Sequence, residues 1–223
     1  MTNKGFFELG PAEERICLLC QNDPLLAKLI GFVGPVSIAA TGDPFEFLVR
    51  AIVGQQLSVK AAETISRRIE EYCGSLSPEA ILAASEDGMR GAGLSRPKIR
   101  YMKELAEQVN RQAIDLTGFD AYSDEEVLAK LMRIKGIGRW TAEMFLIFAL
   151  GRSDILSLGD AGLRRAARWL HASEEVLSDI AHLEKLGERW KPYRSVASIY
   201  LWEAIDRGYV KSKEPLFLSD LEG

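Results

Sequence analysis

Residues 131–150 read LMRIKGIGRWTAEMFLIFAL. Two glycines flank a single isoleucine, and apolar residues at helical spacing lie on both sides of them. Glycine adopts backbone angles that other residues avoid, and it lets the backbone come close to a ligand. The pattern therefore predicts a helix that ends near Arg133, a hairpin over residues 134–138 and a second helix from Arg139. The two isoleucines of the hairpin are expected to hold it in the core.

The start of the second predicted helix is a candidate anion site. The first N–H groups of a helix have no partner within it, and the helix dipole is positive at this end. Both effects favour a bound phosphate group. A glycine turn that only packs two helices together gives the same short pattern, so the hairpin alone leaves both interpretations open.

Helix punctuation continues along the rest of the chain. Asp43 before Pro44 is typical of an N-cap followed by a first-turn proline. Further N-caps are expected at Ser58, Ser77, Ser95 and Ser123, the last forming a capping box with Glu126. The helix after Ser58 is expected to turn its apolar residues inward: Val59, Ala62, Ile65, Ile69 and Tyr72. No stretch shows sustained strand alternation, so the predicted fold class is all-α, a helical bundle.

Composition places the chain among ordinary globular proteins, with 47% hydrophobic and 27% charged residues in a length of 223. Three cysteines cannot form a disulfide framework, and with two histidines they make a poor metal set. Cys17 and Cys20 are expected to pack in the core. The first twenty residues lack the pattern of a signal peptide, and no window approaches a membrane span. A cytoplasmic location without membrane attachment is therefore expected.

The net charge of −4 is unevenly distributed. Residues 130–168 contain eight basic and three acidic residues, which gives this stretch a charge of +5. A local basic excess in an acidic protein is consistent with an anion-binding face, and also with solvated helix surfaces. Charge alone does not decide between the two.

The full hairpin pattern is more specific than its glycines. Leu131-x-x-Ile134-x-Gly136-Ile137-Gly138-x-Trp140-Thr141-Ala142 resembles the helix-hairpin-helix of base-excision DNA glycosylases, and its Trp-Thr-Ala ending resembles the 3-methyladenine branch. Four further stretches match in order: FEFLVRAIVGQQLSVKAA, GLSRPKIRYMKELA, LSLGDAGLRR and ERWKPYRSVASIYLWEA.

The resemblance implies one glycosylase domain over residues 1–223, built from two helical lobes with a DNA-binding cleft between them. Residues of about 45–150 would form the central lobe with the hairpin. Residues 1–44 and 151–223 would form the second lobe.

The resemblance also implies how the hairpin binds DNA. Phosphate contacts are expected at the hairpin and the following helix, namely at Gly136, Gly138, Arg139 and Thr141. Backbone carbonyls of Met132, Ile134 and Ile137 would hold a structural Na⁺ or K⁺. Arg194 and Ser195 would either meet phosphate at another helix start or complete a surface salt-bridge pattern.

Asp160 occupies the position of the family's catalytic aspartate, in a Gly-Asp step that also suits an N-cap. Breaking an N-glycosidic bond builds positive charge on the sugar, which a nearby carboxylate stabilises. Because an alkylated purine is already cationic, it leaves without a second acid, and no catalytic cofactor is expected.

The remaining site residues come from the same resemblance. Trp140, Trp202 and Met144 would line the base pocket, where an aromatic face attracts a cationic base. Gln56, with Leu57 beside it, would fill the gap left by the flipped nucleotide. The alternative is a helix connection in which the glutamines Gln55 and Gln56 only cap backbone groups. Met144 and Glu203 stand where some relatives have aromatic residues, which leaves the lesions accepted beyond 3-methyladenine open.

The predicted function is a monofunctional glycosylase that excises alkylated purines, chiefly 3-methyladenine, from double-stranded DNA and works as a monomer. One alternative is a bifunctional glycosylase and abasic lyase for oxidised bases. Such relatives have a lysine two residues after the second hairpin glycine, where this chain has Trp140. The other alternative is a non-catalytic helix-hairpin-helix protein that binds DNA.

Overall fold

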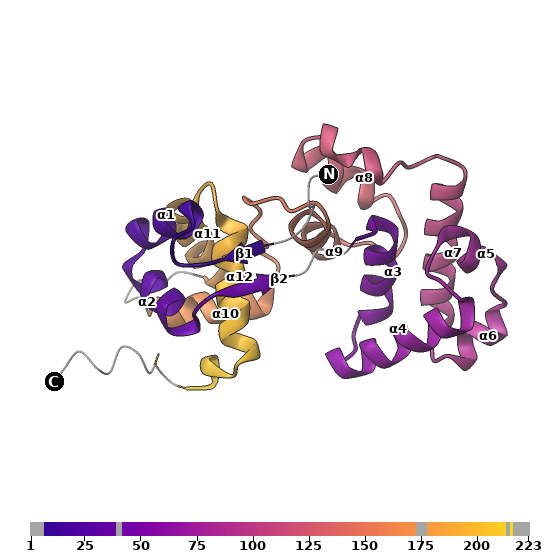
Figure 1. Cartoon of the computed structure of the whole chain (residues 1–223), viewed down its shortest axis with the longest axis horizontal. Helices are drawn as coiled ribbons and strands as arrows, with labels where there is room; N and C mark the ends of the chain where they lie inside the picture. Colours follow the sequence, from indigo (N-terminus) through magenta and orange to yellow (C-terminus); the bar gives the residue numbers. More distant parts are fainter. Residues whose placement is uncertain (1–6, 39–41, 173–177, 213–214, 216–223) are drawn as a thin grey trace. The chain divides into compact units, whose positions relative to one another are not determined.

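The structure is a computed structural model that describes residues 7–38, 42–172, 178–212 and 215. The chain divides into two compact units. One unit is Thr41–Leu150, and the other combines Met1–Ala40 with Gly151–Gly223. Figure 1 shows that helices form nearly all of the regular structure in each, which confirms the all-α class. Within the described residues, no helix is long and apolar enough to cross a membrane.

The unit Thr41–Leu150 is built around α3 and α7. Its elements are α3 (Pro44–Gly54), α4 (Val59–Cys73), α5 (Pro78–Ala83), α6 (Glu86–Gly91), α7 (Arg96–Asn110), the 3₁₀ helix η1 (Thr117–Ala121), α8 (Asp124–Leu131), α9 (Arg139–Met144) and the π-helical η2 (Phe145–Ala149). Helix α7 packs against α3, α5 and α6 (Figure 1). Leu48, Ile52 and Leu105 are wholly buried in this unit.

Most of the predicted helix caps are present. Asp43 accepts hydrogen bonds from the backbone N–H groups of Phe45 and Glu46 at the start of α3. Ser58 and Ser77 cap α4 and α5, and Ser123 forms the predicted capping box with Glu126. Ser95 stands at the N-cap position of α7, but its side chain makes no capping hydrogen bond.

The prediction for the inner face of α4 is wrong at both ends of the helix. Ile69 is wholly buried, whereas Val59 is 75% exposed and Tyr72 is also exposed. Tyr72 instead lies on α6, where its hydroxyl is 3.0 Å from Ser85 Oγ and its ring covers Gly88. The apolar spacing identified the helix but not which turns of it have a neighbour.

The second unit has a helical core with one short sheet. Its elements are β1 (Phe7–Leu9), α1 (Glu14–Asn22), α2 (Pro24–Val33), β2 (Val36–Ile38), α10 (Ala161–Leu170), α11 (Asp179–Trp190), α12 (Arg194–Asp206) and the 3₁₀ helix η3 (Tyr209–Lys211). Strands β1 and β2 pair antiparallel, with Phe7 opposite Ile38 and Leu9 opposite Val36. Strands of three residues are too short to show a sequence alternation. Helix α12 contacts α1, α2, α10 and α11, which explains its apolar sequence.

The cysteine prediction is wrong for Cys17, which is exposed on α1. Cys20 and Cys73 are half-buried, and all three thiols are free. Ile16 and Leu19 supply the buried face of α1, so Cys17 falls on the opposite side of the helix.

A buried carboxylate joins the two sequence segments of this unit. Asp23 accepts hydrogen bonds from the Leu26 N–H at 3.0 Å and the Trp190 indole at 2.8 Å. His171 Nε2 lies 2.8 Å from Oδ2, the oxygen that also accepts from Trp190, and 2.9 Å from Oδ1. Burial by itself raises the pKa of Asp23, but the hydrogen bond and charge of His171, with the Leu26 and Trp190 donors, outweigh it and lower the pKa to about 2. The ionised form of Asp23 therefore stabilises the unit.

We predict that Asp23→Asn lowers the free energy of unfolding by roughly 3 kcal/mol at neutral pH, since it breaks a buried polar cluster. The folded-state pKa is depressed, so this stabilisation is present above a pH of about 4 and is lost as the pH falls toward 2. Urea unfolding of both proteins from about pH 6 to about pH 3 measures the difference. A difference that stays constant over this range would contradict the assignment.

Candidate functional site

The hairpin lies between α8 and α9, as the sequence predicted. Ile134 donates its backbone N–H to the Leu131 carbonyl at 3.0 Å, and Ile137 donates to the Ile134 carbonyl at 3.1 Å. Both isoleucine side chains are buried, which confirms that they hold the hairpin in the core. Met132 follows the last residue of α8 and is exposed.

The two hairpin glycines have different roles. Gly136 has a φ of +88°, the left-handed region that favours glycine. A Cβ at this position would lie 2.4 Å from Tyr101 Cδ2, so the Tyr101 ring leaves room only for a glycine. Gly138 has an ordinary φ of −87°, and a Cβ there would meet nothing within 4 Å. Only Gly136 is required by the fold, and Gly138 has open space beside its Cα.

Helix α9 begins immediately after Gly138. The Gly138 carbonyl accepts the Ala142 N–H at 3.0 Å, which leaves the first-turn N–H groups at the positive end of the helix. Trp140 is 49% exposed in this first turn. Thr141 has a buried side chain, so the expected phosphate contact, which stays a prediction, would be made by its backbone N–H.

Arg139 and Met144 are both constrained by their surroundings. Arg139 is exposed, but its Nε is 2.9 Å from Oε1 of the buried Glu143, so its charge is already paired. Met144 is buried. Sequence reasoning did not single out Glu143, although its i,i+4 spacing from Arg139 is that of an ordinary helical ion pair.

The turn at residues 54–57 lies against the hairpin in the same unit. Leu57 donates its N–H to the Gly54 carbonyl at 3.1 Å, and Gln55 has φ −53° and ψ 127°. Gln56 has a φ of +58°, so these residues form a type II turn with a glutamine where glycine is preferred. Gln56 and Leu57 are exposed at its tip.

Gln55 behaves as expected if the glutamines of this segment cap backbone groups. Its Nε2 donates a 2.7 Å hydrogen bond to the Gly136 carbonyl, so Gln55 does satisfy a backbone group. Lys98 Nζ donates to the carbonyls of Val53 and Gln55 at 2.7 and 2.8 Å. Sequence reasoning missed Lys98, although it lies in one of the matched stretches.

Asp160, in the other unit, is the N-cap of α10. Its Oδ1 accepts the Leu163 N–H at 2.6 Å, and its own N–H donates to the Ser157 carbonyl at 3.1 Å. Gly162 keeps this corner open, because a Cβ there would lie 3.2 Å from Asp160 Oδ1. Arg164 Nη1 donates to the Leu158 carbonyl at 2.8 Å and holds the preceding turn. The half-buried carboxylate is thus fixed at the start of a helix.

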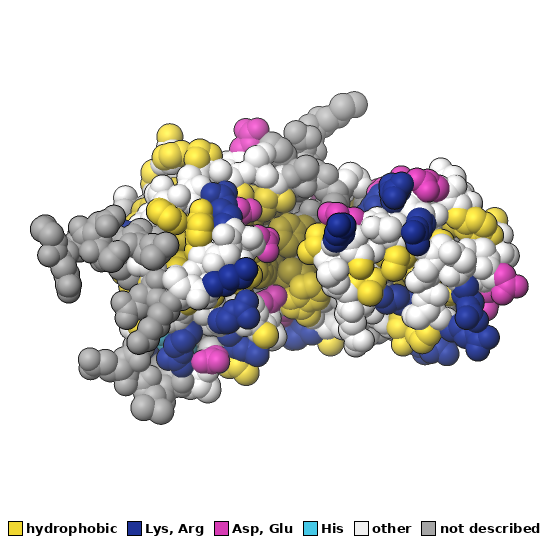
Figure 2. All heavy atoms as spheres, turned by 90° about the horizontal axis from the view of Figure 1, so that it is seen from below, with side chains coloured by type: hydrophobic (Ala, Val, Ile, Leu, Met, Phe, Trp, Pro, Cys, Tyr) yellow, Lys and Arg dark blue, Asp and Glu magenta, His cyan; other side chains and the backbone are white. Residues whose placement is uncertain are grey.

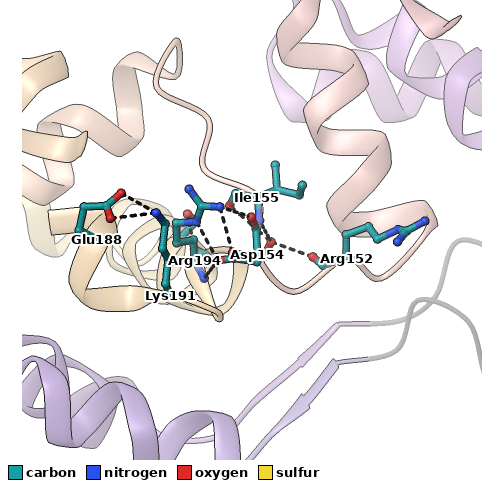
Figure 3. A network of polar contacts seen from close by, with 8 residues as sticks. Arg152, Asp154, Ile155, Glu188, Lys191 and Arg194 are labelled. Atoms are coloured by element: carbon teal, nitrogen blue, oxygen red, sulfur yellow. Dashed lines mark hydrogen bonds and ion pairs between the residues drawn. The ribbon is translucent and has the colours of Figure 1, made fainter. Parts of the chain in front are cut away.

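The start of α12 forms an internal network rather than an open anion site (Figure 3). Arg194 donates from Nε to Asp154 Oδ1 at 2.7 Å and from Nη2 to Oδ2 at 3.0 Å. Ser195 is wholly buried, and its Oγ donates to the Arg152 carbonyl at 2.7 Å and accepts from the Ile155 N–H at 2.9 Å. The hydroxyl of Ser195 thus fixes the 152–155 segment, and the phosphate contact expected at Ser195 stays a prediction. Arg194 matches the alternative of a salt-bridge pattern.

The other predicted pocket position, Trp202, is half-buried on α12. Its neighbour Glu203 accepts from Arg207 Nε at 3.0 Å. On the face that Figure 2 shows, Lys and Arg side chains are spread over each unit with acidic side chains among them. Within the part of the chain that the structure describes, no group of three or more His, Cys, Asp or Glu side chains is placed to hold a metal ion.

These features define a helix-hairpin-helix protein whose hairpin is bonded to an exposed polar turn. Residues 49–192 match the HhH-GPD superfamily of base excision DNA repair proteins. The chain belongs to this superfamily, as the sequence motifs indicated.

Three proteins that are similar to this chain are named as 3-methyladenine DNA glycosylases or glycosidases. The chain is 35% identical over 199 residues to DNA-3-methyladenine glycosylase 1 of Schizosaccharomyces pombe, with 87% of each chain covered. A crystal structure of a DNA-3-methyladenine glycosidase from Bacillus halodurans has a TM-score of 0.83 and 36% identity, over 96% of this chain and 99% of that one. A 3-methyladenine DNA glycosylase of Schizosaccharomyces pombe in complex with abasic DNA has a TM-score of 0.78 and 32% identity, over 87% of this chain and 97% of that one.

The two hairpin glycines give a matched pair of substitutions. We predict that Gly136→Ser lowers the free energy of unfolding by about 2 kcal/mol or more, because a side chain at positive φ is strained and meets Tyr101. Gly138→Ser should stay within about 0.5 kcal/mol of the wild type, since serine is a good N-cap and has open space there. Urea unfolding compares the variants, and equal losses would show that the two positions do not differ in this way.

Proposed function

We propose that this protein is a monofunctional DNA glycosylase that excises alkylated purines, chiefly 3-methyladenine, from double-stranded DNA. The observation that carries the proposal is Asp160, a carboxylate fixed at a helix start at the spacing of the family's catalytic aspartate. Identities of 35% and 36% to proteins named as 3-methyladenine glycosylases support the substrate class. The working form in this proposal is a monomer.

The hairpin would hold the DNA backbone. Gly138 has open space beside its Cα, and the first-turn N–H groups of α9 follow it, an arrangement that suits a phosphate oxygen. Such contacts position the protein but carry no information about the base. Carbonyls of Met132, Ile134 and Ile137 are hard oxygen donors suited to Na⁺ or K⁺, although the Ile134 carbonyl already accepts the Ile137 N–H. A cation there would add positive charge next to the phosphate.

The chemistry follows from the leaving group. A stacked nucleotide must be flipped out before any side chain reaches its glycosidic bond, at a cost of a few kcal/mol. Asp160 would then stabilise the positive charge that develops on the sugar and orient or deprotonate the attacking water. Trp140 is exposed and, with Trp202, would attract a cationic base through the aromatic face. An alkylated purine needs no further acid.

We predict that Asp160→Asn abolishes base excision while DNA binding stays within about tenfold, because phosphate contacts dominate affinity. Asparagine also caps helices, so the start of α10 should be preserved. Single-turnover kinetics on duplex DNA containing 3-methyladenine make the comparison. Asp43→Asn is the matched control, since Asp43 caps α3 in the same manner, and it should excise at the wild-type rate. Near-normal excision by Asp160→Asn would remove Asp160 from the mechanism.

The second candidate function, a glycosylase with lyase activity, needs an unprotonated amine to form a Schiff base with the sugar. Trp140 stands where bifunctional relatives place that lysine. The nearest hairpin lysine, Lys135, has a side chain that is 72% exposed and lies 3.6 Å from Glu104. Lys135 is thus an exposed side chain in a surface ion pair, and it does not stand at the position of that lysine.

We therefore predict that the product is an intact abasic site. Strand breaks should appear only after hot alkali, and borohydride should trap no covalent complex between protein and DNA. Denaturing gels of the reacted DNA, with and without each treatment, measure both. Efficient trapping of the wild-type protein on lesion-containing DNA would favour the bifunctional alternative instead.

A further inference from the structure

Lys98 forms hydrogen bonds to the backbone at the start of the Gly54–Leu57 turn. Helix α3 ends at Gly54, and the last carbonyls of a helix have no partner within it. Lys98 Nζ donates to two carbonyls at this end, those of Val53 at 2.7 Å and Gln55 at 2.8 Å. A cation at the C-terminal end of a helix is also favoured by the dipole. One side chain from α7 therefore completes the end of α3 and fixes the turn that follows.

The position of Lys98 makes these bonds strong. Lys98 is half-buried, and this partial withdrawal from water lowers the pKa of its ammonium. A charged donor removed from water depends on its protein acceptors, and its hydrogen bonds are stronger than those between neutral groups. Loss of the ammonium would leave two carbonyls unsatisfied beside the turn.

The same turn is bonded to the hairpin. Gln55 Nε2 donates to the Gly136 carbonyl at 2.7 Å, across 81 residues of sequence. Tyr101 lies one turn after Lys98 on α7, and its ring packs against Gly136. Helix α7 thus supports the turn through Lys98 and the hairpin through Tyr101, and Gln55 joins the two directly.

The tip of the turn needs this support. Gln56 has a left-handed φ of +58°, which a non-glycine residue keeps only where its surroundings impose it. The residues on either side of the tip are the ones held: Gln55 by Gly136 and Lys98, and Leu57 by Gly54. Gln56 and Leu57 carry their side chains on the exposed side of this fixed backbone.

We propose that Lys98 and Gln55 are positioning residues that fix the Gly54–Leu57 turn to the hairpin, so that Gln56 and Leu57 enter the DNA stack at a set place relative to the bound phosphate. This proposal rests on the proposed function. The hairpin alone grips DNA of any sequence, whereas filling the gap beside a flipped nucleotide requires the turn in its fixed conformation. Loss of Lys98 or Gln55 should therefore weaken the binding of abasic DNA more than the binding of undamaged duplex.

Lys98→Met tests the proposal, with Lys103→Met as the matched control. Lys103 lies on the same helix, and its Nζ donates a 2.8 Å hydrogen bond to the Ala84 carbonyl rather than to the Gly54–Leu57 turn. We expect Lys98→Met to lower the affinity for abasic DNA and the single-turnover rate on 3-methyladenine DNA by about tenfold or more, because small displacements of positioned groups are costly. Affinity for undamaged duplex at the same salt concentration should stay within about twofold for both variants.

A fluorescence signal separates positioning from simple destabilisation. 2-Aminopurine placed next to the abasic site reports the disruption of stacking when the turn enters the DNA. The wild type and Lys103→Met should give the full signal, and Lys98→Met a reduced one. Lys98→Arg keeps a cationic donor and should restore most of it. Thermal unfolding of each variant measures its stability, so that variants of equal stability can be compared.

Gln55→Met provides a second variant that leaves Lys98 in place. If both residues hold one turn, the double variant should lose little more than the single ones, a non-additivity expected of coupled residues. Losses on abasic DNA no larger than those of Lys103→Met at equal stability would overturn the proposal. Absence of base release by the wild type would instead overturn the proposed function, so the two failures are distinguishable.

Discussion

The backbone of Gly136 is the constraint on which the hairpin depends. Its left-handed φ and its contact with the Tyr101 ring allow no side chain, and they set the direction in which its carbonyl points. That carbonyl accepts the hydrogen bond from Gln55 Nε2. The conformation required at Gly136 therefore also fixes the Gly54–Leu57 turn, which is distant in the sequence. The second glycine has another purpose. Gly138 has an ordinary conformation and open space beside it, which suits close approach of a ligand rather than a tight turn.

Asp160 shows how one side chain can serve both the fold and the proposed reaction. Its Oδ1 caps α10 through the Leu163 N–H, and this bond fixes the orientation of the carboxylate. A carboxylate has several lone pairs, so a capping bond leaves acceptor capacity for water or for interaction with a developing cation. Pre-organised charge of this kind is the main source of transition-state stabilisation in many enzymes. The N-cap interpretation and the catalytic one are therefore compatible.

Features encoded by neighbouring residues were predictable from the sequence, and those that need distant partners were not. The hairpin, its buried isoleucines and the caps at Asp43, Ser58, Ser77 and Ser123 follow from local patterns and are present. The bonds of Lys98 to the end of α3 join residues more than forty positions apart, and no local pattern indicates them. The burial of Thr141 and Ser195 was not predictable either, because a hydroxyl beside a helix start looks the same in sequence whether it faces inward or outward.

A glycosylase performs chemistry on DNA, whereas a non-catalytic relative only binds it. Chromatography of the bases that the wild-type protein releases from methylated duplex DNA distinguishes the two. We expect free 3-methyladenine to accumulate with time and protein concentration, while the DNA strands stay unbroken. Tight binding of the same DNA without release of any base would show that the chain is a non-catalytic helix-hairpin-helix protein.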